Sequence, residues 1–311
     1  MEKPLTANIR PGKPPLSIKE YEQADGYQAA RKALLSMTPG GVADLVKESN
    51  LRGRGGAGFP TGQKWSFVPM GADAVHPKYL IVNADEMEPA AFKDRLLLEG
   101  DPHQLIEGII IAGYAIQTDI AYIFLRREYT QPAKHLKTAI AEAYAAGYLG
   151  RNILGSGYSL ELYLHESAGR YICGEETALL SSLEGRRALP RAKPPFPPVV
   201  GLWGKPTTPN NVETISNVPH IVNHGAAWFK GLSHSPDGGT KIYGVSGRVE
   251  RPGAWELPMG TTLREILIEQ AGRRRMDPGG RAPYLRFRGA EHGDRGRGRT
   301  VPAALCGSEC G

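Results

Sequence analysis

The chain has 311 residues, of which 41% are hydrophobic, and a formal net charge of +6. This length is enough for one large or two medium domains with a sizeable core. The sequence has neither an apolar run long enough to cross a bilayer nor a signal-peptide pattern, so we expect no direct insertion into a membrane. Three cysteines, Cys173, Cys306 and Cys310, are too few for a disulfide scaffold and fit a reducing compartment.

The first 40 residues predict an extension followed by a helix. Residues 1–18 are rich in proline and are expected to lie extended over the body of the protein or over a partner. Residues 18–37 have apolar side chains at helical spacing, and the sequence Thr-Pro-Gly-Gly at 38–41 predicts the end of that helix.

The stretch from Leu51 to Lys64, LRGRGGAGFPTGQK, is the densest in glycine. Glycine lets the backbone approach another surface closely, and exposed N–H groups beside Arg54 and Lys64 suit an anion. We therefore expect a loop that holds a phosphate or lies against a planar cofactor. Its G-x-G-x-x-G pattern, Gly53 to Gly58, is not an ordinary Rossmann fingerprint, because the residues before it predict a helix and not a strand. A flexible linker is the alternative, but the aromatic residues that follow are not typical of linkers.

Three apolar runs predict the buried strands of an α/β layer fold. The strands are expected at residues 79–82, 120–125 and 161–165, and helices at 104–116 and 131–146. The first strand is followed by four polar residues, Asn83, Asp85, Glu86 and Glu88. Because ligands of open α/β sheets lie at the carboxyl ends of strands, these residues are candidates for a site. The alternative is a solvated turn that caps the next helix.

A second dense segment, GRYICGEETALLSSLEG at residues 169–185, predicts a helix that begins near Glu175 and Glu176. These acids either cap that helix or accept hydrogen bonds from a nucleotide. Cys173 is expected to be a small buried packing residue. The proline-rich segment 191–198 is typical of a lid. Residues 212–217 predict another helix, after two asparagines that offer side-chain amides.

Five groups of motifs occur in one order: RGRGGAGFPTGQKW; NADEMEP with KDR; YICGEETAL with SLEGRR; KPPFP with GLWGKPT; and NNVETISNVP. From about Pro4 to Gly272 the chain resembles the NADH- and FMN-binding flavoprotein subunit of bacterial NADH:quinone oxidoreductase, respiratory complex I. Diaphorase subunits of NAD-reducing hydrogenases and NAD-linked formate dehydrogenases share these motifs. The sequence YQAARKAL from Tyr27 favours complex I.

The resemblance implies hydride transfer from NADH to bound FMN, with the protein supplying orientation and electrostatics and no catalytic side chain. The FMN-binding positions that it implies are Gly53, Arg54, Gly55, Gly56, Lys64, Asn83, Asp85, Glu86, Gly174, Glu175, Asn210, Asn211 and Thr214. The NADH-binding positions that it implies are Gly56, Ala57, Phe59, Lys64, Phe67, Glu88, Tyr171, Glu176 and Phe196. Glu88 and Glu176 would repel the 2′-phosphate of NADPH if they lie near it.

The resemblance also implies a Rossmann-like FMN/NADH-binding α/β domain at residues 41–238 and an incomplete ubiquitin-like, SLBB-type α+β domain at 239–272. Two residues depart from the family pattern. Ala90 stands where glycine is usual, which strains the turn if its φ is positive. Pro209 stands where an aliphatic residue is usual and removes a backbone N–H.

Residues 273–311 do not resemble the family and have nine arginines, four acidic residues and no lysine. The family's later helical bundle, with cysteine ligands for a [4Fe-4S] cluster, has no counterpart, and Cys306 and Cys310 offer two thiols where four are needed. No metal site is therefore predicted, and onward electron transfer is expected to be compromised. One hypothesis is that this tail is translated out of frame in a frameshifted or truncated copy. The other is a disordered arm that binds nucleic acid, against which the nearly neutral charge of the rest argues.

By the same resemblance, the expected partners besides NADH are the small [2Fe-2S] subunit and the large iron–sulfur subunit of the complex I peripheral arm. The expected location is the cytoplasmic face of the bacterial inner membrane. Two functions stay open. The chain is either an NADH dehydrogenase module or a non-enzymatic fragment whose incomplete fold does not hold flavin.

Overall fold

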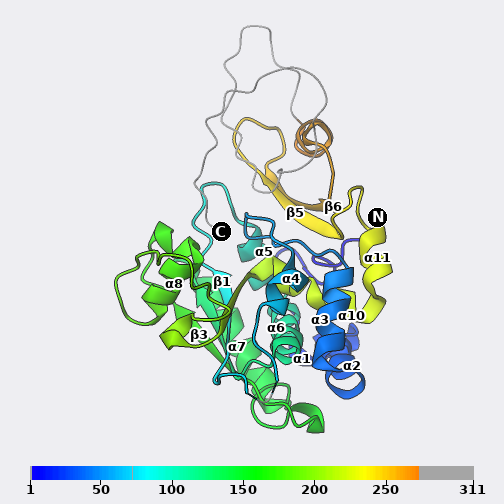
Figure 1. Ribbon diagram of the computed structural model, residues 1–311. Coiled ribbons are helices and arrows are strands. Elements are labelled where there is room, and N and C mark those ends of the chain that lie inside the picture. Colours follow the sequence, from blue (N-terminus) through cyan, green and yellow to red (C-terminus); the bar gives the residue numbers. More distant parts are fainter. Residues whose placement is uncertain (1, 72, 273–311) are drawn as a thin grey trace.

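The computed structural model describes residues 2–71 and 73–272, and the larger part of the fold is built on a parallel β-sheet (Figure 1). Its strands are β1 (Tyr79–Ala84), β2 (Ile120–Leu125), β3 (Glu161–Glu166) and β4 (Thr207–Asn211). They lie in the order β3-β2-β1-β4, and each neighbouring pair is parallel. The three strands expected from apolar runs are confirmed, and β4 is one that the sequence did not predict.

Pro209 in the middle of β4 explains why this strand was missed, since proline within a run argues against a strand. In the structure β4 is an edge strand that pairs only with β1, and Pro209 lies opposite Ile81. Proline is tolerated on an edge strand because one side of its backbone has no neighbouring strand to bond.

Helices surround the sheet. They are α1 (Ile18–Gln23), α2 (Gln28–Ser36), α3 (Pro39–Glu48), α4 (Thr61–Ser66), α5 (Lys93–Gly100), α6 (Pro102–Ile116), α7 (Thr130–Ala145), α8 (Glu176–Leu183), α9 (Val212–Ser216), α10 (Val218–His224) and α11 (Ala226–Gly231). Short helical turns are η1 (Ile153–Gly155), η2 (Tyr171–Gly174), η3 (Leu202–Gly204) and η4 (Glu265–Gln270). None of the helices in 2–71 and 73–272 is both long and apolar enough to cross a membrane.

The single helix expected over residues 18–37 is wrong. The chain forms α1 and α2 instead, and between them Asp25 and Tyr27 have positive φ angles of 64° and 60°, which a helix cannot contain. The predicted helix end is confirmed, because α2 stops at Ser36 just before the Thr-Pro-Gly-Gly sequence, and the same sequence also begins the next helix. Thr38 caps α3 by accepting a hydrogen bond from the backbone N–H of Gly41.

Both faces of the sheet are covered, as the continuous apolar runs predicted. Leu80 and Val82 of β1 belong to the large core that includes the buried isoleucines of α6. Tyr79 and Ile81 point to the other face and pack in a smaller core with Leu179 of α8. This arrangement leaves the carboxyl ends of the strands as the edge where loops converge.

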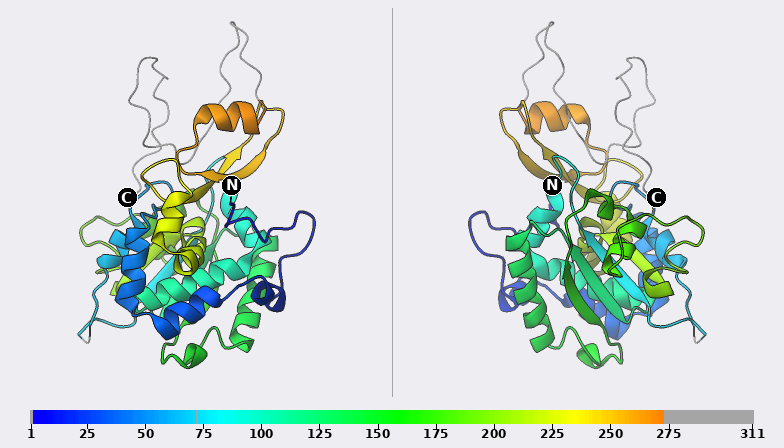
Figure 2. Two further views of the ribbon diagram at one scale, coloured as in Figure 1. Left: turned by 90° about the vertical axis from the view of Figure 1, so that its right-hand side faces the viewer. Right: turned by 90° about the vertical axis from the view of Figure 1, so that its left-hand side faces the viewer.

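A small antiparallel hairpin, β5 (Thr240–Val245) and β6 (Gly253–Pro258), follows the larger part and has its own apolar cluster with η4. In both views of Figure 2 the hairpin and η4 lie at one end of the larger body. The N-terminal segment contacts this hairpin. The buried carboxylate of Glu256 accepts hydrogen bonds from the backbone N–H groups of Leu5 (3.1 Å) and Thr6 (2.9 Å).

Candidate functional site

The carboxyl end of β1 is followed by an acidic side chain, Asp85, that has a hydrogen-bond partner for only one of its two carboxylate oxygens among the described residues. Asp85 is buried, and its Oδ1 accepts a hydrogen bond from the Ser167 hydroxyl (3.2 Å), just after β3. Its Oδ2 is also buried and has no hydrogen-bond partner within the described residues. Burial raises the pKa of Asp85 to about 6. An oxygen of this kind is suited to a ligand that supplies a donor.

The glycine loop, residues 51–60, connects α3 to α4, so no strand precedes it, as expected. A hydrogen bond from the backbone N–H of Gly53 to the carbonyl of Phe59 (2.9 Å) closes it, and Gly58 needs its positive φ of 67°. The loop packs on the end of β4. A Cβ added to Gly55 would lie 3.3 Å from the Cβ of Asn211.

Arg54 and Lys64, the two cations expected beside this loop, have different surroundings. The guanidinium of Arg54 is 2% exposed, and its Nη2 donates to the carbonyls of Gly238 and Thr240 at 3.0 Å each. The expectation that this side chain adds charge for an anion is therefore not supported, because backbone acceptors hold it beneath the loop. Lys64 instead forms an ion pair with Glu176 (Nζ–Oε2 3.0 Å).

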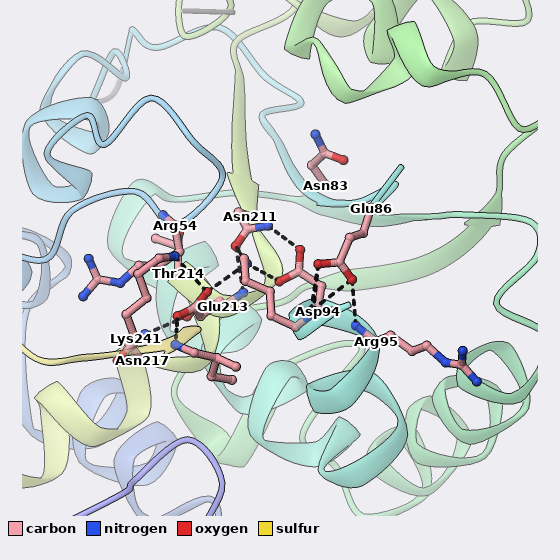
Figure 3. A network of polar contacts seen from close by, with 12 residues as sticks. Arg54, Asn83, Glu86, Asp94, Arg95, Asn211, Glu213, Thr214, Asn217 and Lys241 are labelled. Carbon is pink, nitrogen blue, oxygen red and sulfur yellow. Dashed lines mark hydrogen bonds and ion pairs between the residues drawn. The ribbon is translucent and has the colours of Figure 1, made fainter. Parts of the chain in front are cut away.

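Glu86 and Glu175 use their side chains as helix caps, the alternative that the sequence left open. The Glu86 carboxylate accepts hydrogen bonds from the backbone N–H groups at the start of α5, as Figure 3 shows for Asp94 and Arg95. Glu175 accepts from the N–H groups of Thr177 (2.8 Å) and Ala178 (2.7 Å) at the start of α8. Both carboxylates are thus engaged within the fold, and Glu175 Oε1 also lies 3.4 Å from Lys193 Nζ, so their expected contact with FMN stays a prediction.

Lys93, Asp94, Glu213 and Lys241 form a cluster, here called the buried ion cluster, that sequence reasoning missed (Figure 3). Lys93 Nζ lies 2.6 Å from Asp94 Oδ1 and 2.8 Å from Glu213 Oε2, and Lys241 Nζ lies 3.6 Å from the latter oxygen. The Asn211 amide donates to Asp94 Oδ2 (2.7 Å), which joins the cluster to the end of β4.

The pKa values in the buried ion cluster follow from burial and from the neighbouring charges. Burial favours a neutral Glu213, but Lys241, Lys93 and Arg54 outweigh it and lower the pKa of this carboxyl to about 2. Burial lowers the pKa of Lys241 to about 8, with Glu213 opposing. Glu213 is therefore ionised throughout the physiological range. No local signal in the sequence marks these residues, because the ion partners of Glu213 lie far from it along the chain.

A second group of charges, here called the clasp, consists of Lys64, Glu176 and Lys193. The Glu176 carboxylate accepts from both lysines, at 3.0 Å from Lys64 Nζ and 2.7 Å from Lys193 Nζ. Burial raises the pKa of Glu176, but the two lysines outweigh burial and leave it below its ordinary value. The clasp joins α4, α8 and the proline-rich segment that contains Lys193.

Exposed aromatic side chains lie within a few residues of each member of the clasp along the chain. Phe59 and Phe67 flank α4, with ring centroids 6.1 Å apart, and both are exposed. Tyr171 and Phe196 are 58% and 57% exposed, and the Tyr171 hydroxyl donates to the Glu88 carboxylate. Four exposed aromatics in the segments expected to contact NADH are consistent with stacking surfaces.

The remaining expected site residues lie at the same edge or on its loops. The Asn83 amide donates to the carbonyl of Gly174 (3.0 Å), which brings the end of β1 to the turn before α8. Asn210 is buried in β4, and Gly56 and Ala57 are exposed at the tip of the glycine loop. Ala90 has a φ of 65°, so the condition for strain at this position is met.

The cysteine predictions divide between described and undescribed residues. Cys173 is buried against the smaller core, as expected, and burial raises the pKa of its thiol. Cys306, Cys310 and the arginine-rich tail lie outside the described residues. Within 2–71 and 73–272, no group of three or more His, Cys, Asp and Glu side chains is placed to hold a metal ion.

Comparisons with known proteins match two parts of the chain. A model of the Nuo51 FMN-binding domain matches residues 46–220, and a model of the SLBB domain matches 242–273. The chain is 55% identical over 269 residues to the F subunit of NADH-quinone oxidoreductase from Salmonella typhimurium and from Escherichia coli. These alignments cover 86% of this chain and 60% of the relatives, so the chain spans about three fifths of their length. A solved NAD+-reducing [NiFe]-hydrogenase in its air-oxidized state is similar with a TM-score of 0.68 and 40% identity, over 80% of this chain and 40% of that one.

Proposed function

Because the chain belongs to the family of the Nuo51 FMN-binding domain, we propose that it binds FMN at the carboxyl edge of its sheet and is the NADH-oxidising module of a bacterial NADH-quinone oxidoreductase. FMN, when bound, supplies the acceptor for hydride from NADH. The proposed domain limits are 41–238 for the cofactor-binding part and 239–272 for the SLBB-type part.

The observation that carries this proposal is the meeting of the glycine loop with the ends of β1 and β4. Asp85 offers a buried oxygen without a partner among the described residues, and Asn83 and Asn211 lie at the same edge, where their amides already donate to Gly174 and Asp94. Gly174 has open space where a Cβ would project, and Gly55 allows the loop to lie close to β4. A polar, planar ring system with donors and acceptors along its rim fits this set of groups.

The NADH side of the proposal rests on the clasp and the exposed aromatics. Phe59, Phe67 and Phe196 offer ring faces for adenine or nicotinamide. Lys64 is held by Glu176, so the carboxylate orients the cation toward one side of the loop. The role of these chain residues is to bind and orient the nucleotide, and no side chain is required to take up a proton. Because Glu88 is acidic, we propose NADH over NADPH as donor, whereas the charge of Glu176 is already balanced by Lys64 and Lys193.

Two alternatives remain, each with an observation behind it. A diaphorase subunit of a hydrogenase is supported by the structural similarity, but identity is 40% there against 55% to the NADH-quinone oxidoreductase relatives. The second alternative, a non-enzymatic fragment that does not hold flavin, is supported by Ala90, whose φ of 65° strains a turn where the family usually has glycine. The proposed partners are the small [2Fe-2S] and the large iron–sulfur subunit, and the proposed location is the cytoplasmic face of the inner membrane.

The test is a visible absorption spectrum of the purified chain after incubation with FMN and removal of free flavin, before and after anaerobic addition of NADH. We expect a flavin spectrum that NADH bleaches. Gly55→Val, which fills the contact with Asn211, should abolish FMN retention, whereas Gly40→Val, at an exposed glycine with nothing within 4 Å, should not. A wild-type chain that retains no FMN would overturn the proposal in favour of the non-enzymatic fragment.

A further inference from the structure

We infer that Arg54 is a positioning residue that anchors the glycine loop to β5, so that the small hairpin is a structural part of the candidate cofactor site. The anchoring itself follows from contacts within the chain. Only its consequence for FMN rests on the proposed function.

The first link joins the loop to the hairpin. Arg54 Nη2 donates to the carbonyl of Gly238 and to that of Thr240, the first residue of β5, and the side chain is buried. A buried guanidinium that lost these acceptors would keep its desolvation cost with no compensation, so the contact holds the loop tightly.

The second link joins the loop to α9. The backbone N–H of Arg54 donates to the hydroxyl of Thr214 (2.8 Å), and this bond is buried. The side chain and the backbone of one loop residue are thus fixed by two different elements. Gly55, the next residue, is the one that packs on Asn211 at the end of β4.

The third link closes a triangle between α9 and β5. Glu213 Oε1 accepts from the backbone N–H of Ile242 (2.9 Å), and Lys241 Nζ lies 3.6 Å from Glu213 Oε2. Figure 3 shows Arg54, Glu213, Thr214 and Lys241 in this arrangement. Because loop, helix and hairpin are each bonded to the other two, a change at the hairpin contact is transmitted to the glycine loop.

Arg52 provides a matched control from the same loop. Its Nε lies 2.9 Å from Asp237 Oδ1, immediately before the segment that Arg54 contacts, but its side chain is 38% exposed. An ion pair of this kind contributes little, because solvent screens it. The two arginines therefore share residue type and neighbourhood and differ in burial.

The experiment measures backbone hydrogen exchange at Gly53 and Arg54 in the chain without FMN, because these two loop amides donate to Phe59 and Thr214. Arg54→Met should accelerate exchange there by about tenfold or more, Arg54→Lys should restore part of the protection, and Arg52→Met should change it by less than about threefold. Glu107→Gln controls for general destabilisation, since Glu107 is buried far from the loop in sequence and accepts from Tyr21 and Ala30. Unchanged exchange in Arg54→Met, or equal acceleration in Glu107→Gln, would overturn the inference. If Arg54→Met does not fold, Arg54→Lys and Arg52→Met give the comparison.

The consequence for the cofactor is measured separately, by titrating FMN into each variant and following flavin fluorescence and absorption. We expect about tenfold weaker binding in Arg54→Met and partial rescue in Arg54→Lys. If the wild-type chain binds no FMN but its loop exchange depends on Arg54, the proposed function is wrong and the anchoring stands. If wild-type and Arg54→Met bind FMN equally, the link between hairpin and cofactor is wrong.

Discussion

The buried ion cluster and the clasp use the same two residue types in opposite settings. In the cluster, Lys93 and Glu213 are buried, and their remaining polar contacts are made by backbone and by Asn211. In the clasp, Lys64 and Glu176 are partly exposed and lie among loops with exposed aromatics. Both groups join separate elements of the fold, but the charges of the clasp are in partial contact with solvent and those of the cluster are not.

The difference shows how desolvation decides what a lysine–glutamate pair does. Two buried charges must stay paired, because an unpaired buried charge destabilises the fold by several kcal/mol. Two charges near the surface gain little from each other and exchange partners readily. Burial therefore decides the role of a lysine–glutamate pair. A buried pair stabilises the fold, whereas a partly exposed pair is available to bind a ligand.

The largest expected effect is from Glu213→Gln, which keeps the shape and the acceptor for Ile242 but leaves Lys93 and Lys241 short of a counter-charge. We expect a loss of about 3 kcal/mol in the free energy of unfolding at pH 7, measured by urea denaturation. The folded pKa of Glu213, about 2, lies below its ordinary 4.5. Its stabilisation is therefore present above pH 4.5 and is lost as the pH falls through 2, so the deficit of the variant should shrink in that window.

Lys241→Met is the control for Glu213→Gln. Glu213 keeps Lys93 and Arg54 as counter-charges once Lys241 is removed, and burial already disfavours the charged form of Lys241, so we expect Lys241→Met to cost less than Glu213→Gln does. A Glu213→Gln variant that is as stable as the wild type would mean that the cluster is not needed to join α5, α9 and β5.

The next expected effect, from Asp85→Asn, is a gain in the free energy of unfolding and not a loss. In the folded state the pKa of Asp85 is about 6, above its ordinary value of 3.8. Between these two pH values the folded state binds more protons than the unfolded state. Wild-type stability therefore falls as the pH rises from 3.8 through 6. Asp85→Asn should therefore raise the free energy of unfolding of the FMN-free chain at pH 7 by about 1–2 kcal/mol, less than the full cost of the charge because the new amide is buried too.

Denaturation of Asp85→Asn at a series of pH values provides the check. The advantage over wild type should diminish as the pH falls from 6 toward 4. The same variant should bind FMN more weakly, because a destabilising carboxylate at a ligand site is retained for binding. A loss of stability at pH 7 would show that Asp85 has a structural partner.

The smallest effect is expected from Glu176→Gln in the clasp. It makes the same chemical change as Glu213→Gln, but water can solvate Lys64 and Lys193 once the carboxylate charge is gone. The free energy of unfolding should change by less than about 1 kcal/mol, and the change should be smaller still in high salt. A loss as large as that of Glu213→Gln would erase the distinction between the two groups.

The sequence predicted the elements whose signals are local and missed those whose stability comes from distant residues. β1 and β2 were found because each is a continuous apolar run, β3 because apolar and polar residues alternate at its start, and α6 because Asp101 and Pro102 mark its start. β4 was missed because a proline is acceptable only at an edge position that the local sequence does not reveal.

The candidate site shows the same division. The motifs located the edge, and the structure brings Asn83 to Gly174 and the glycine loop to Asn211. What the motifs did not indicate is which side chains face inward. Arg54 faces the hairpin and Glu86 caps α5, because their partners are backbone groups whose positions depend on the folded chain.

The contact between the N-terminal segment and Glu256 has a consequence for the order in which the protein is made. Residues 5 and 6 are synthesised about 250 positions before their acceptor on β6. The N-terminal segment therefore cannot make this contact until β6 has been synthesised. Until then Leu5, which is buried in the folded protein, lacks this partner and is open to other apolar contacts, including those with chaperones. Its docking is a late event in biogenesis, and contacts of such long range are slow to form.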